Sequence, residues 1–306
     1  MIRIQKVQLR EIHLRLREPF LISSGVSEDR RILLVELTDV DGIVGWGECV
    51  APEYPNYSPE TIDTGWLAIS DWVVPRVLNV EIDKPGRIHP ALQTDFRGHN
   101  MAKAAVEMAA WELSSRRDGL SLSVTLGGSR ALVPVGISIG IQETPGHLVS
   151  RVRKSLGEGY RKIKVKIQPG QDFHFLEAVY EEFGDHLDWM VDANNAYSLG
   201  DLAQLRKLDR FGLMMIEQPL AWDDLLCHAE LQAQLQTPIC LDESITSVRA
   251  FEWALKLGAC RIINIKMGRV GGLSVAVKLH QMARDAGIPC WVGGMLESGI
   301  GAGISI

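Results

Sequence analysis

The stretch Lys162-Ile163-Lys164-Val165-Lys166-Ile167 alternates charged and aliphatic residues with a period of two. In a β-strand, this period places the lysines on one face and the aliphatic residues on the other. Four more short apolar runs follow at steps of 24 to 26 residues, and each ends in a charged residue: Asp192, Glu217, Asp242 and Lys266. One strand, one helix and two short loops fill such a step. The repeat therefore predicts βα units whose charges lie at the mouth of a β/α-barrel.

The first third of the chain has a different pattern, in which strand-like and helix-like stretches succeed each other without a repeat. Residues 2–15 and 31–48 are rich in β-branched and aliphatic residues, and Asp39-Val40-Asp41-Gly42 is typical of a hairpin turn. These features predict a small antiparallel sheet. We expect ordered loops at Pro19 to Gly25 and Ala51 to Tyr57, and helices over residues 59–79 and 99–118.

Together these patterns predict an α/β chain of two domains. An α+β N-terminal domain is expected over residues 1–130 and the barrel domain over residues 131–306. The rhythm places the seventh barrel strand at Cys290 to Gly293, and only Glu297 to Ile306 remain for everything after it. We therefore expect a barrel without its eighth strand. We also expect the chain to be a fragment of a longer product, poorly soluble and nearly inactive alone.

Composition narrows the class of protein. The chain has 306 residues, of which 46% are hydrophobic and 23% charged, and it is expected to be globular. A net charge of −6 and a pI near 5.8 argue against nucleic acid or an anionic membrane as the main partner. No run approaches the ~18 apolar residues that cross a bilayer. Five cysteines without a CxxC pair are interpreted as reduced, and we expect a cytoplasmic protein.

Asp192, Glu217 and Asp242 end three consecutive predicted strands, so their side chains are expected to project into one space. Three carboxylates in one space repel each other unless a cation lies among them, and oxygen ligands suit a hard ion such as Mg²⁺. Each carboxylate could instead cap the helix that follows it. Their regular spacing favours the metal site, because active-site residues of barrels cluster at strand C-terminal ends.

The inward-facing lysines suggest the chemistry. Lys166 is nearest the predicted mouth, Lys164 lies beside it, and Lys266 on strand six is expected across the barrel. A lysine must be neutral to act as a base, and a neighbouring Lys164 and a divalent cation would lower the pKa of Lys166 from ~10.4. This pattern predicts a site that removes an α-proton from a carboxylate substrate. Asn194 and Asn264 either support that site or satisfy the backbone.

Several motifs carry a resemblance to a known family. With the lysine strand, they are Val191-Asp192-Ala193-Asn194, Ile216-Glu217-Gln218-Pro219, Leu241-Asp242-Glu243-Ser244 and Asn264-Ile265-Lys266. They resemble the muconate lactonizing enzyme subgroup of the enolase superfamily. More narrowly, Gly45 to Val50, Ile263 to Gly272 and Gly293 to Gly299 resemble o-succinylbenzoate synthases that overlap with N-succinylamino acid and N-acylamino acid racemases. The likeness covers essentially the whole chain.

The resemblance implies an α+β capping domain followed by an enolase-type (β/α)₇β barrel, with loops near Phe20 and Tyr57 that close over the substrate. It implies Mg²⁺, with Mn²⁺ as an alternative, and gives each residue a role. The implied metal ligands are Asp192, Glu217 and Asp242, and the implied catalytic residues are Lys166, Lys266 and Lys164. We expect substrate contacts at Phe20, Ser138, Asn194, Gly294 and Met295.

The implied activity is Mg²⁺-dependent removal of an α-proton from a small carboxylate through an enediolate. The expected enzyme is a hydro-lyase that forms o-succinylbenzoate for menaquinone biosynthesis, with N-acylamino acid racemase activity beside it. An N-succinylamino acid racemase is the alternative, because both reactions begin with the same proton transfer. The expected partner is a small carboxylate, with no nucleic acid and no membrane, and the expected assembly is a homo-oligomer.

Three other hypotheses compete. A lysine such as Lys266 in a barrel can form a Schiff base, but the three carboxylates would then lack a purpose. The glycine-rich runs at Gly268 to Gly272 and Gly299 to Gly303 lack the context of a dinucleotide site and are expected to be tight loops. The third hypothesis is a binding protein or non-catalytic fragment on an enzyme scaffold, because a fold does not determine a function. The complete set of six charged residues at the predicted mouth argues against it.

Overall fold

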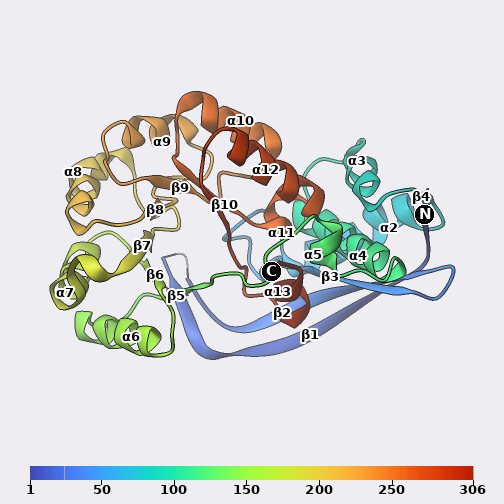
Figure 1. The fold of residues 1–306 in the computed structure, drawn as a ribbon, viewed down its shortest axis with the longest axis horizontal. Coiled ribbons are helices and arrows are strands. Elements are labelled where there is room, and N and C mark those ends of the chain that lie inside the picture. Colours follow the sequence, from blue (N-terminus) through green and yellow to red (C-terminus); the bar gives the residue numbers. More distant parts are fainter. Residues whose placement is uncertain (24, 306) are drawn as a thin grey trace.

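The computed structural model describes residues 1–23 and 25–305, which form two sheets surrounded by helices. Figure 1 shows one sheet as an arc of strands with helices along its outer side. The other sheet and its helices lie on the opposite side of the molecule. This is the predicted combination of a capping domain and an enolase-type barrel, of which the described residues form seven strands.

The capping sheet is antiparallel and consists of β1 (Ile2–Ile22), β2 (Gly25–Asp39), β3 (Val44–Cys49) and β4 (Glu81–Ile82), in the order β3-β2-β1-β4. The loop predicted at Pro19 to Gly25 is largely wrong. β1 continues to Ile22, and Phe20 pairs with Ser27. Pairing satisfies backbone groups that a loop would leave to water. Ser24, within that expected loop, lies outside the described residues, and the long hairpin extends to β5 and β6 in Figure 1.

Helix α4 (Asn100–Arg117) forms the centre of the capping domain, where its alanine-rich face is buried. Gly45 and Gly47 of β3 permit close packing, because a Cβ at Gly47 would clash with the backbone oxygen of Ala105. The predicted helix over residues 59–79 is divided into segments. The other capping elements are α1 (Ile62–Ala68), the π-helical η1 (Ile69–Val73), α2 (Val74–Val77), η2 (Pro85–Arg87), α3 (Ile88–Gln93) and α5 (Leu122–Thr125).

The second sheet is parallel, with the order β11-β10-β9-β8-β7-β6-β5. Its strands are β5 (Gly136–Ile139), β6 (Lys162–Lys166), β7 (Asp188–Asp192), β8 (Ile216–Glu217), β9 (Ile239–Leu241), β10 (Ile262–Ile265) and β11 (Cys290–Val292). Each lies within a predicted strand, although β5 and β8 are shorter than expected. Outward-facing residues such as Trp189 and Val191 pack against the helices and form the larger hydrophobic core.

Helices follow the strands, mostly along the outside of the arc, whereas the helix directly after β10 and the last helix of the chain lie against the capping domain. They are α6 (Pro145–Gly157), α7 (Asp172–Phe183), η3 (Gly184–His186), η4 (Leu199–Asp201), α8 (Leu202–Leu205), η5 (Arg206–Phe211), α9 (Leu225–Gln232), α10 (Val248–Leu257), α11 (Met267–Val270), α12 (Leu273–Asp285) and α13 (Gly299–Ser305). The glycine-rich run at Gly299 to Gly303 was expected to be a loop and is instead helical. Its first turn is stabilised by Glu48, which accepts hydrogen bonds from Ser298 N and Gly301 N at 3.1 and 3.0 Å.

Buried glutamates join the capping domain to the barrel helices. Glu107 of α4 accepts hydrogen bonds from Leu273 N and Ser274 N, at 2.7 and 3.0 Å, and so caps α12. Glu48 of β3 caps α13 in the same way. Burial raises the pKa of both carboxyl groups, and hydrogen bonds to the helix N-termini oppose that effect. The two domains are therefore held together by polar contacts as well as by packing.

Two further sequence expectations concern cysteines and membranes. All five cysteines are unpaired, as expected. Among the described residues, no helix combines the length and the apolar character needed to cross a membrane.

Candidate active site

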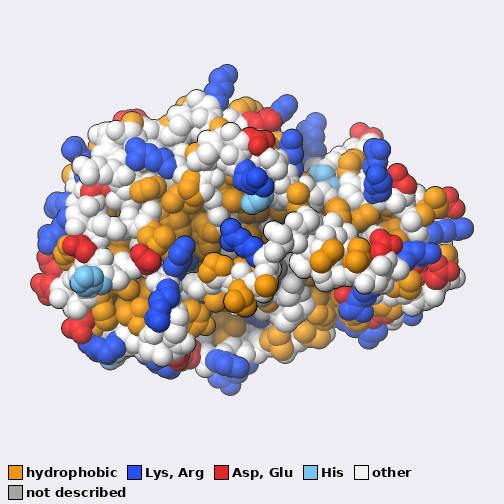
Figure 2. Space-filling view, viewed as in Figure 1, with side chains coloured by type: hydrophobic (Ala, Val, Ile, Leu, Met, Phe, Trp, Pro, Cys, Tyr) orange, Lys and Arg blue, Asp and Glu red, His pale blue; other side chains and the backbone are white. Residues whose placement is uncertain are grey.

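The inner face of the barrel sheet has an apolar layer below a charged layer. The apolar layer is a small buried cluster of Met190, Met215 and Cys240, against which Trp291 packs. Two residues further along the same strands come Asp192, Glu217 and Asp242. Because side chains alternate along a strand, both layers face inward. Figure 2 shows a hollow inside the arc of strands with apolar side chains around it.

Two lysines of β6 contact the carboxylates of β7 and β8. Lys164 Nζ donates to Asp192 Oδ2 at 2.9 Å and to Glu217 Oε2 at 2.7 Å. Lys166 Nζ donates to Asp192 Oδ2 at 2.6 Å. Both carboxylates are almost completely buried. The charged residues of three neighbouring strands therefore meet as the sequence predicted.

The two lysines differ in their pKa. Burial opposes the charged form of Lys164, but Asp192 and Glu217 outweigh it and raise the pKa of this lysine. For Lys166, burial is the larger effect and lowers the pKa, and the neighbouring Lys164 acts in the same direction. Burial would raise the pKa of Asp192, yet the two lysines hold it below its usual range. Lys166 is therefore the lysine of this strand that loses its proton more readily.

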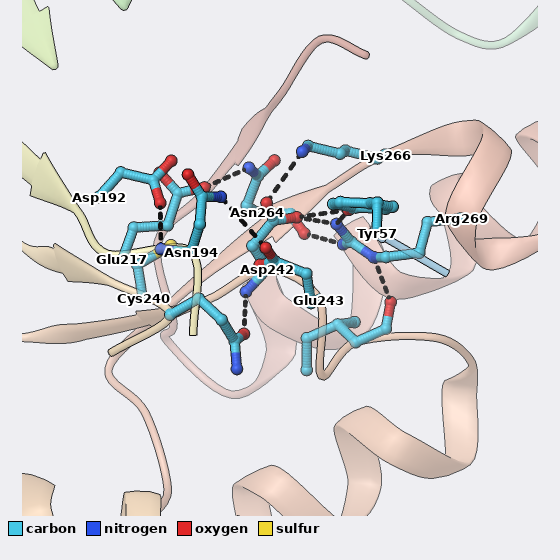
Figure 3. A network of polar contacts seen from close by, with 12 residues as sticks. Tyr57, Asp192, Asn194, Glu217, Cys240, Asp242, Glu243, Asn264, Lys266 and Arg269 are labelled. Carbon is cyan, nitrogen blue, oxygen red and sulfur yellow. Dashed lines mark hydrogen bonds and ion pairs between the residues drawn. The ribbon is translucent and has the colours of Figure 1, made fainter. Parts of the chain in front are cut away.

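A second polar group surrounds Asp242, as Figure 3 shows. Lys266 Nζ donates to Asp242 Oδ2 at 2.8 Å, and Arg269 Nη1 contacts Oδ1. Tyr57 OH donates to the same Oδ1 at 3.2 Å, and its ring centroid is 4.9 Å from Lys266 Nζ. Burial would lower the pKa of Lys266, but Tyr57 and nearby carboxylates such as Glu243 outweigh it and raise that pKa. β10 and β6 are separated by three strands, so Lys266 and Lys166 approach the site from opposite sides.

Amide side chains connect these charged groups. Asn194 Oδ1 accepts a hydrogen bond from Lys166 Nζ at 2.6 Å, and Asn264 Nδ2 donates to Glu217 Oε1 at 2.7 Å. Gln218 Oε1 accepts from the backbone N–H of Asp242 at 2.9 Å and thereby links the ends of β8 and β9. Asn194 and Gln218 have φ angles of 43° and 37°. Such left-handed conformations are uncommon outside glycine and concentrate at functional sites.

The capping domain reaches the site at two places. The Phe20 ring lies 5.8 Å from Lys166 Nζ, and Ser23 Oγ donates to the backbone oxygen of Ala193 at 3.2 Å. Tyr57 contacts Asp242 from the other loop. Both segments that were expected to lie over the site therefore contact its residues.

The remaining predicted substrate contacts lie around this centre. Ser138 of β5 pairs with Lys164 of β6, and its Oγ is buried without a partner among the described residues. Gly294 and Met295 follow β11 at the other edge of the sheet, where Met295 packs against the core of the capping domain. Ser138 at one edge and Gly294 and Met295 at the other thus lie on either side of the strands that carry the charged residues. Direct contact with a substrate stays a prediction for these residues.

The donor atoms of the site suit a hard cation. In the described part of the chain, no three His, Cys, Asp or Glu side chains are placed to share one ion. Lys164 instead lies between Asp192 and Glu217, while Asp242 faces Lys266 and Arg269. Buried carboxylates need a positive partner, and the ammonium groups fill that need here. Asn264 Oδ1 is buried and unpartnered within the described residues, so an additional oxygen is free beside Glu217. Carboxylate and amide oxygens are the ligands that Mg²⁺ prefers, so these residues fit the ion by the chemistry of their donor atoms.

Sequence reasoning missed three residues of this network. Arg269, Glu243 and Gln218 are almost completely buried. Arg269 follows Lys266 by three residues in the glycine-rich stretch that was interpreted as a loop, where an arginine is normally exposed. The structure instead forms helix α11 over Met267–Val270, and only Gly271 and Gly272 lie beyond it. Glu243 and Gln218 each directly follow a predicted ligand, and that position was the only available signal.

Comparison with known families covers nearly the whole chain. Residues 4–127 match the family described as Mandelate racemase / muconate lactonizing enzyme, N-terminal domain, and residues 147–306 match Enolase C-terminal domain-like. The chain belongs to the mandelate racemase / muconate lactonizing enzyme family of the enolase superfamily. The match supports the fold and the family that the sequence motifs predicted.

Two curated members of this family represent both expected activities. The o-succinylbenzoate synthase of Geobacillus kaustophilus is 47% identical over 98% of this chain and 80% of its own length. The N-succinylamino acid racemase of Amycolatopsis sp is 44% identical over 99% of this chain and 82% of its own length. The chain therefore spans about four-fifths of these relatives.

A solved structure of an enolase superfamily member from Listeria innocua has a TM-score of 0.95 at 39% identity, covering 100% of this chain and 82% of its own. A muconate lactonizing enzyme from Pseudomonas fluorescens, complexed with muconolactone, has a TM-score of 0.94 at 27% identity, covering 99% of this chain and 83% of its own. The capping domain and the parallel sheet of this chain therefore match parts of both structures.

Proposed function

We propose that the chain is a Mg²⁺-dependent o-succinylbenzoate synthase, a hydro-lyase of menaquinone biosynthesis that acts through an enediolate. The observation that carries the proposal is the pair of largely buried lysine side chains, Lys166 and Lys266, on opposite sides of three carboxylates. Family relatives with 40 to 48% identity are named o-succinylbenzoate synthase. We further propose that the enzyme is a cytoplasmic homo-oligomer.

Lys166 is the base in this proposal. Its lowered pKa favours the neutral amine that accepts a proton, and Asn194 Oδ1 holds its Nζ in place. The α-C–H bond breaks, the Lys166 amine takes the proton, and the electron pair moves into the substrate carboxylate to form the enediolate. The pair then returns to form a C=C bond as the C–O bond breaks, and the leaving hydroxide takes the proton from the Lys166 ammonium to become water. Lys266, with its raised pKa, remains a fixed cation beside the developing negative charge. Mg²⁺ bound by Asp192, Glu217 and Asp242 would neutralise part of the same charge.

N-succinylamino acid racemase, with other N-acylamino acids as further substrates, is the second candidate. The observation that favours it is the opposite pKa shift of the two lysines, lowered for Lys166 and raised for Lys266. One lysine suited to accept a proton and one suited to donate it, on opposite faces, are what inversion at an α-carbon requires. Relatives in Amycolatopsis sp and Thermus thermophilus carry this name.

A panel of acids in D₂O distinguishes the two activities. The panel contains the hydrated precursor of o-succinylbenzoate and several N-succinyl and N-acetyl amino acids, each followed by proton NMR with Mg²⁺. The proposal predicts dehydration of the precursor, loss of that activity in excess chelator, and no trapping of Lys266 by borohydride. Turnover that persists without metal, or a borohydride adduct at Lys266, would contradict it. Exchange of amino-acid derivatives alone would favour the racemase.

A further inference from the structure

Glu243 lies in the site without an assigned role. Its side chain is buried, and Oε1 accepts hydrogen bonds from Asn194 Nδ2 and Asn195 Nδ2, both at 3.1 Å. Figure 3 shows the contact between Asn194 and Glu243 beside Asp242. Within the described residues, the buried Oε2 has no hydrogen-bond partner. An unsatisfied buried oxygen costs ~1 to 3 kcal/mol, so a contribution to stability does not explain this side chain.

The Asn194 amide lies between two charged groups that demand different atoms. A carboxylate accepts hydrogen bonds, and an ammonium group donates them. Nδ2 therefore faces Glu243, and Oδ1 faces Lys166 Nζ at 2.6 Å. A reversed amide would place N–H groups against the ammonium and an oxygen against the carboxylate. Glu243 and Lys166 together thus select one orientation of Asn194.

Glu243 also restrains the turn that carries this amide. Asn194 and Asn195 have φ angles of 43° and 66°, and Glu243 binds both side chains. The backbone N–H of Asn194 donates to Asp192 Oδ1 at 3.1 Å, which ties the turn to the end of β7. Two consecutive left-handed residues are unfavourable unless their surroundings hold them, and Glu243 supplies that support.

We propose that Glu243 is a positioning residue for Lys166, acting through the Asn194 amide. Asp192 is shared between Lys164 and Lys166, whereas Asn194 Oδ1 contacts Lys166 alone among the lysines of the site. Lys266 is held by Asp242 and lies near Tyr57, so it does not depend on Asn194. The inference rests on the proposed function, in which Lys166 is the base. Its larger effect is therefore expected on the substrate face that Lys166 serves, because Glu243 makes a hydrogen-bonded connection to Lys166 and acts on Lys266 only through its charge.

The first test needs no substrate. The side-chain amide protons of Asn194, identified in ¹⁵N NMR spectra by their loss in Asn194→Asp, are protected from solvent exchange by Glu243. Glu243→Ala removes that protection. Glu243→Gln retains it, because Gln still presents an oxygen to the two asparagines. Unchanged protection in Glu243→Ala, or equal loss in both variants, would overturn the orienting role.

The second test uses the two enantiomers of N-succinyl-phenylalanine in D₂O with Mg²⁺. Glu243→Ala slows α-proton exchange of the enantiomer served by Lys166 by at least about tenfold and leaves the other within about threefold. Glu243→Gln stays close to the unsubstituted chain for both. When Glu243→Ala and Asn194→Ala are combined, the loss of exchange equals that of Asn194→Ala alone, because both substitutions remove the same contact to Lys166. Equal loss for both enantiomers would overturn the inference.

Mn²⁺ titration separates positioning from metal binding. If Glu243 positions Lys166, Glu243→Gln leaves Mn²⁺ affinity unchanged. A decrease as large as that in Glu217→Gln would make Glu243 a ligand and overturn the inference. An unsubstituted chain that neither exchanges either enantiomer nor dehydrates the precursor of o-succinylbenzoate would refute the proposed base and the catalytic part of the inference. The NMR protection test would still decide whether Glu243 orients Asn194.

Discussion

Lys164 and Lys166 show how different contacts shift the pKa of two neighbouring lysines in opposite directions. Both point inward from β6, and both side chains are largely but not completely buried. Lys164 contacts two carboxylates, which raise its pKa, whereas Lys166 contacts one carboxylate and the neutral Asn194, and burial lowers its pKa. The neighbouring charge of Lys164 contributes to that decrease, as the sequence predicted, but burial is the larger cause.

At the residue scale, a substitution of Glu217 tests whether this carboxylate binds the metal ion. Glu217→Gln removes the charge of a fully buried carboxylate while preserving its shape, so we expect Mn²⁺ affinity to fall by at least about tenfold in a titration. The exposed Glu181→Gln serves as the control and leaves affinity unchanged. Equal affinities of the chain before and after the Glu217 substitution would remove this residue from the metal site.

The charged centre was predictable because five of its residues lie at strand ends in a regular repeat. Lys164 and Lys166 lie on one face of β6, as the alternation of a strand requires, and both contact Asp192 of the neighbouring β7. Arg269 and Glu243 were not predictable in the same way. Their burial depends on how the segments that follow β9 and β10 fold over the sheet. Neither strand periodicity nor the spacing of charges indicates how these segments fold.

At the element scale, Glu107 is expected to support α12. It accepts hydrogen bonds from Leu273 N, Ser274 N and Trp111 Nε1, the last at 2.8 Å. Glu107→Ala leaves buried donors without partners and lowers the free energy of unfolding by about 2 to 4 kcal/mol. Glu107→Gln retains an acceptor and costs less. Urea denaturation measures both, with the exposed Glu181→Ala as the control. A Glu107→Ala chain as stable as this control would contradict the assignment.

Lys103 of the same capping helix makes stability depend on pH. Its Nζ is buried, donates to Phe96 O at 2.5 Å and lies 4.3 Å from the Phe96 ring centroid. Burial lowers the pKa of Lys103 from 10.5 to about 8, although Glu60 opposes the shift.

Below about pH 8 Lys103 is charged in both states, and above 10.5 it is neutral in both. Between these values the unfolded chain binds more protons, so stability rises with pH, by about 1 to 2 kcal/mol. Lys103→Met removes this increase. Urea denaturation of both proteins from pH 7.5 to 10.5 measures the free energy of unfolding at each pH. The same dependence on pH in both proteins would contradict the role of Lys103.

Elements with a strong repeat were predicted well, and segments that depend on distant contacts were not. The βα rhythm placed all seven barrel strands correctly. The extension of β1 through Phe20 depends on pairing with Ser27, which an apolar loop pattern does not indicate. Similarly, α13 forms in a glycine-rich run because Glu48, some 250 residues earlier in the chain, caps it.

At the scale of the whole molecule, the arc of strands has two edges. In the described residues, β5 pairs only with β6 and β11 pairs only with β10, and Val292 of β11 is exposed. We expect backbone amides of β5 and β11 to exchange with deuterium at least about tenfold faster than those of β7, which is paired on both sides. Mass spectrometry of peptides after exchange measures this. Uniform protection across the sheet would contradict it.

The central claim is that Lys166 and Lys266 address opposite faces of one α-carbon. Exchange of each enantiomer of N-succinyl-phenylalanine in D₂O, followed by proton NMR with Mg²⁺, tests it most directly. We predict that Lys166→Ala and Lys266→Ala both abolish racemisation, and that each retains α-proton exchange of one enantiomer, the two variants retaining opposite ones. Equal loss of exchange from both enantiomers in either variant, or racemisation by a single-lysine variant, would contradict the two-lysine geometry.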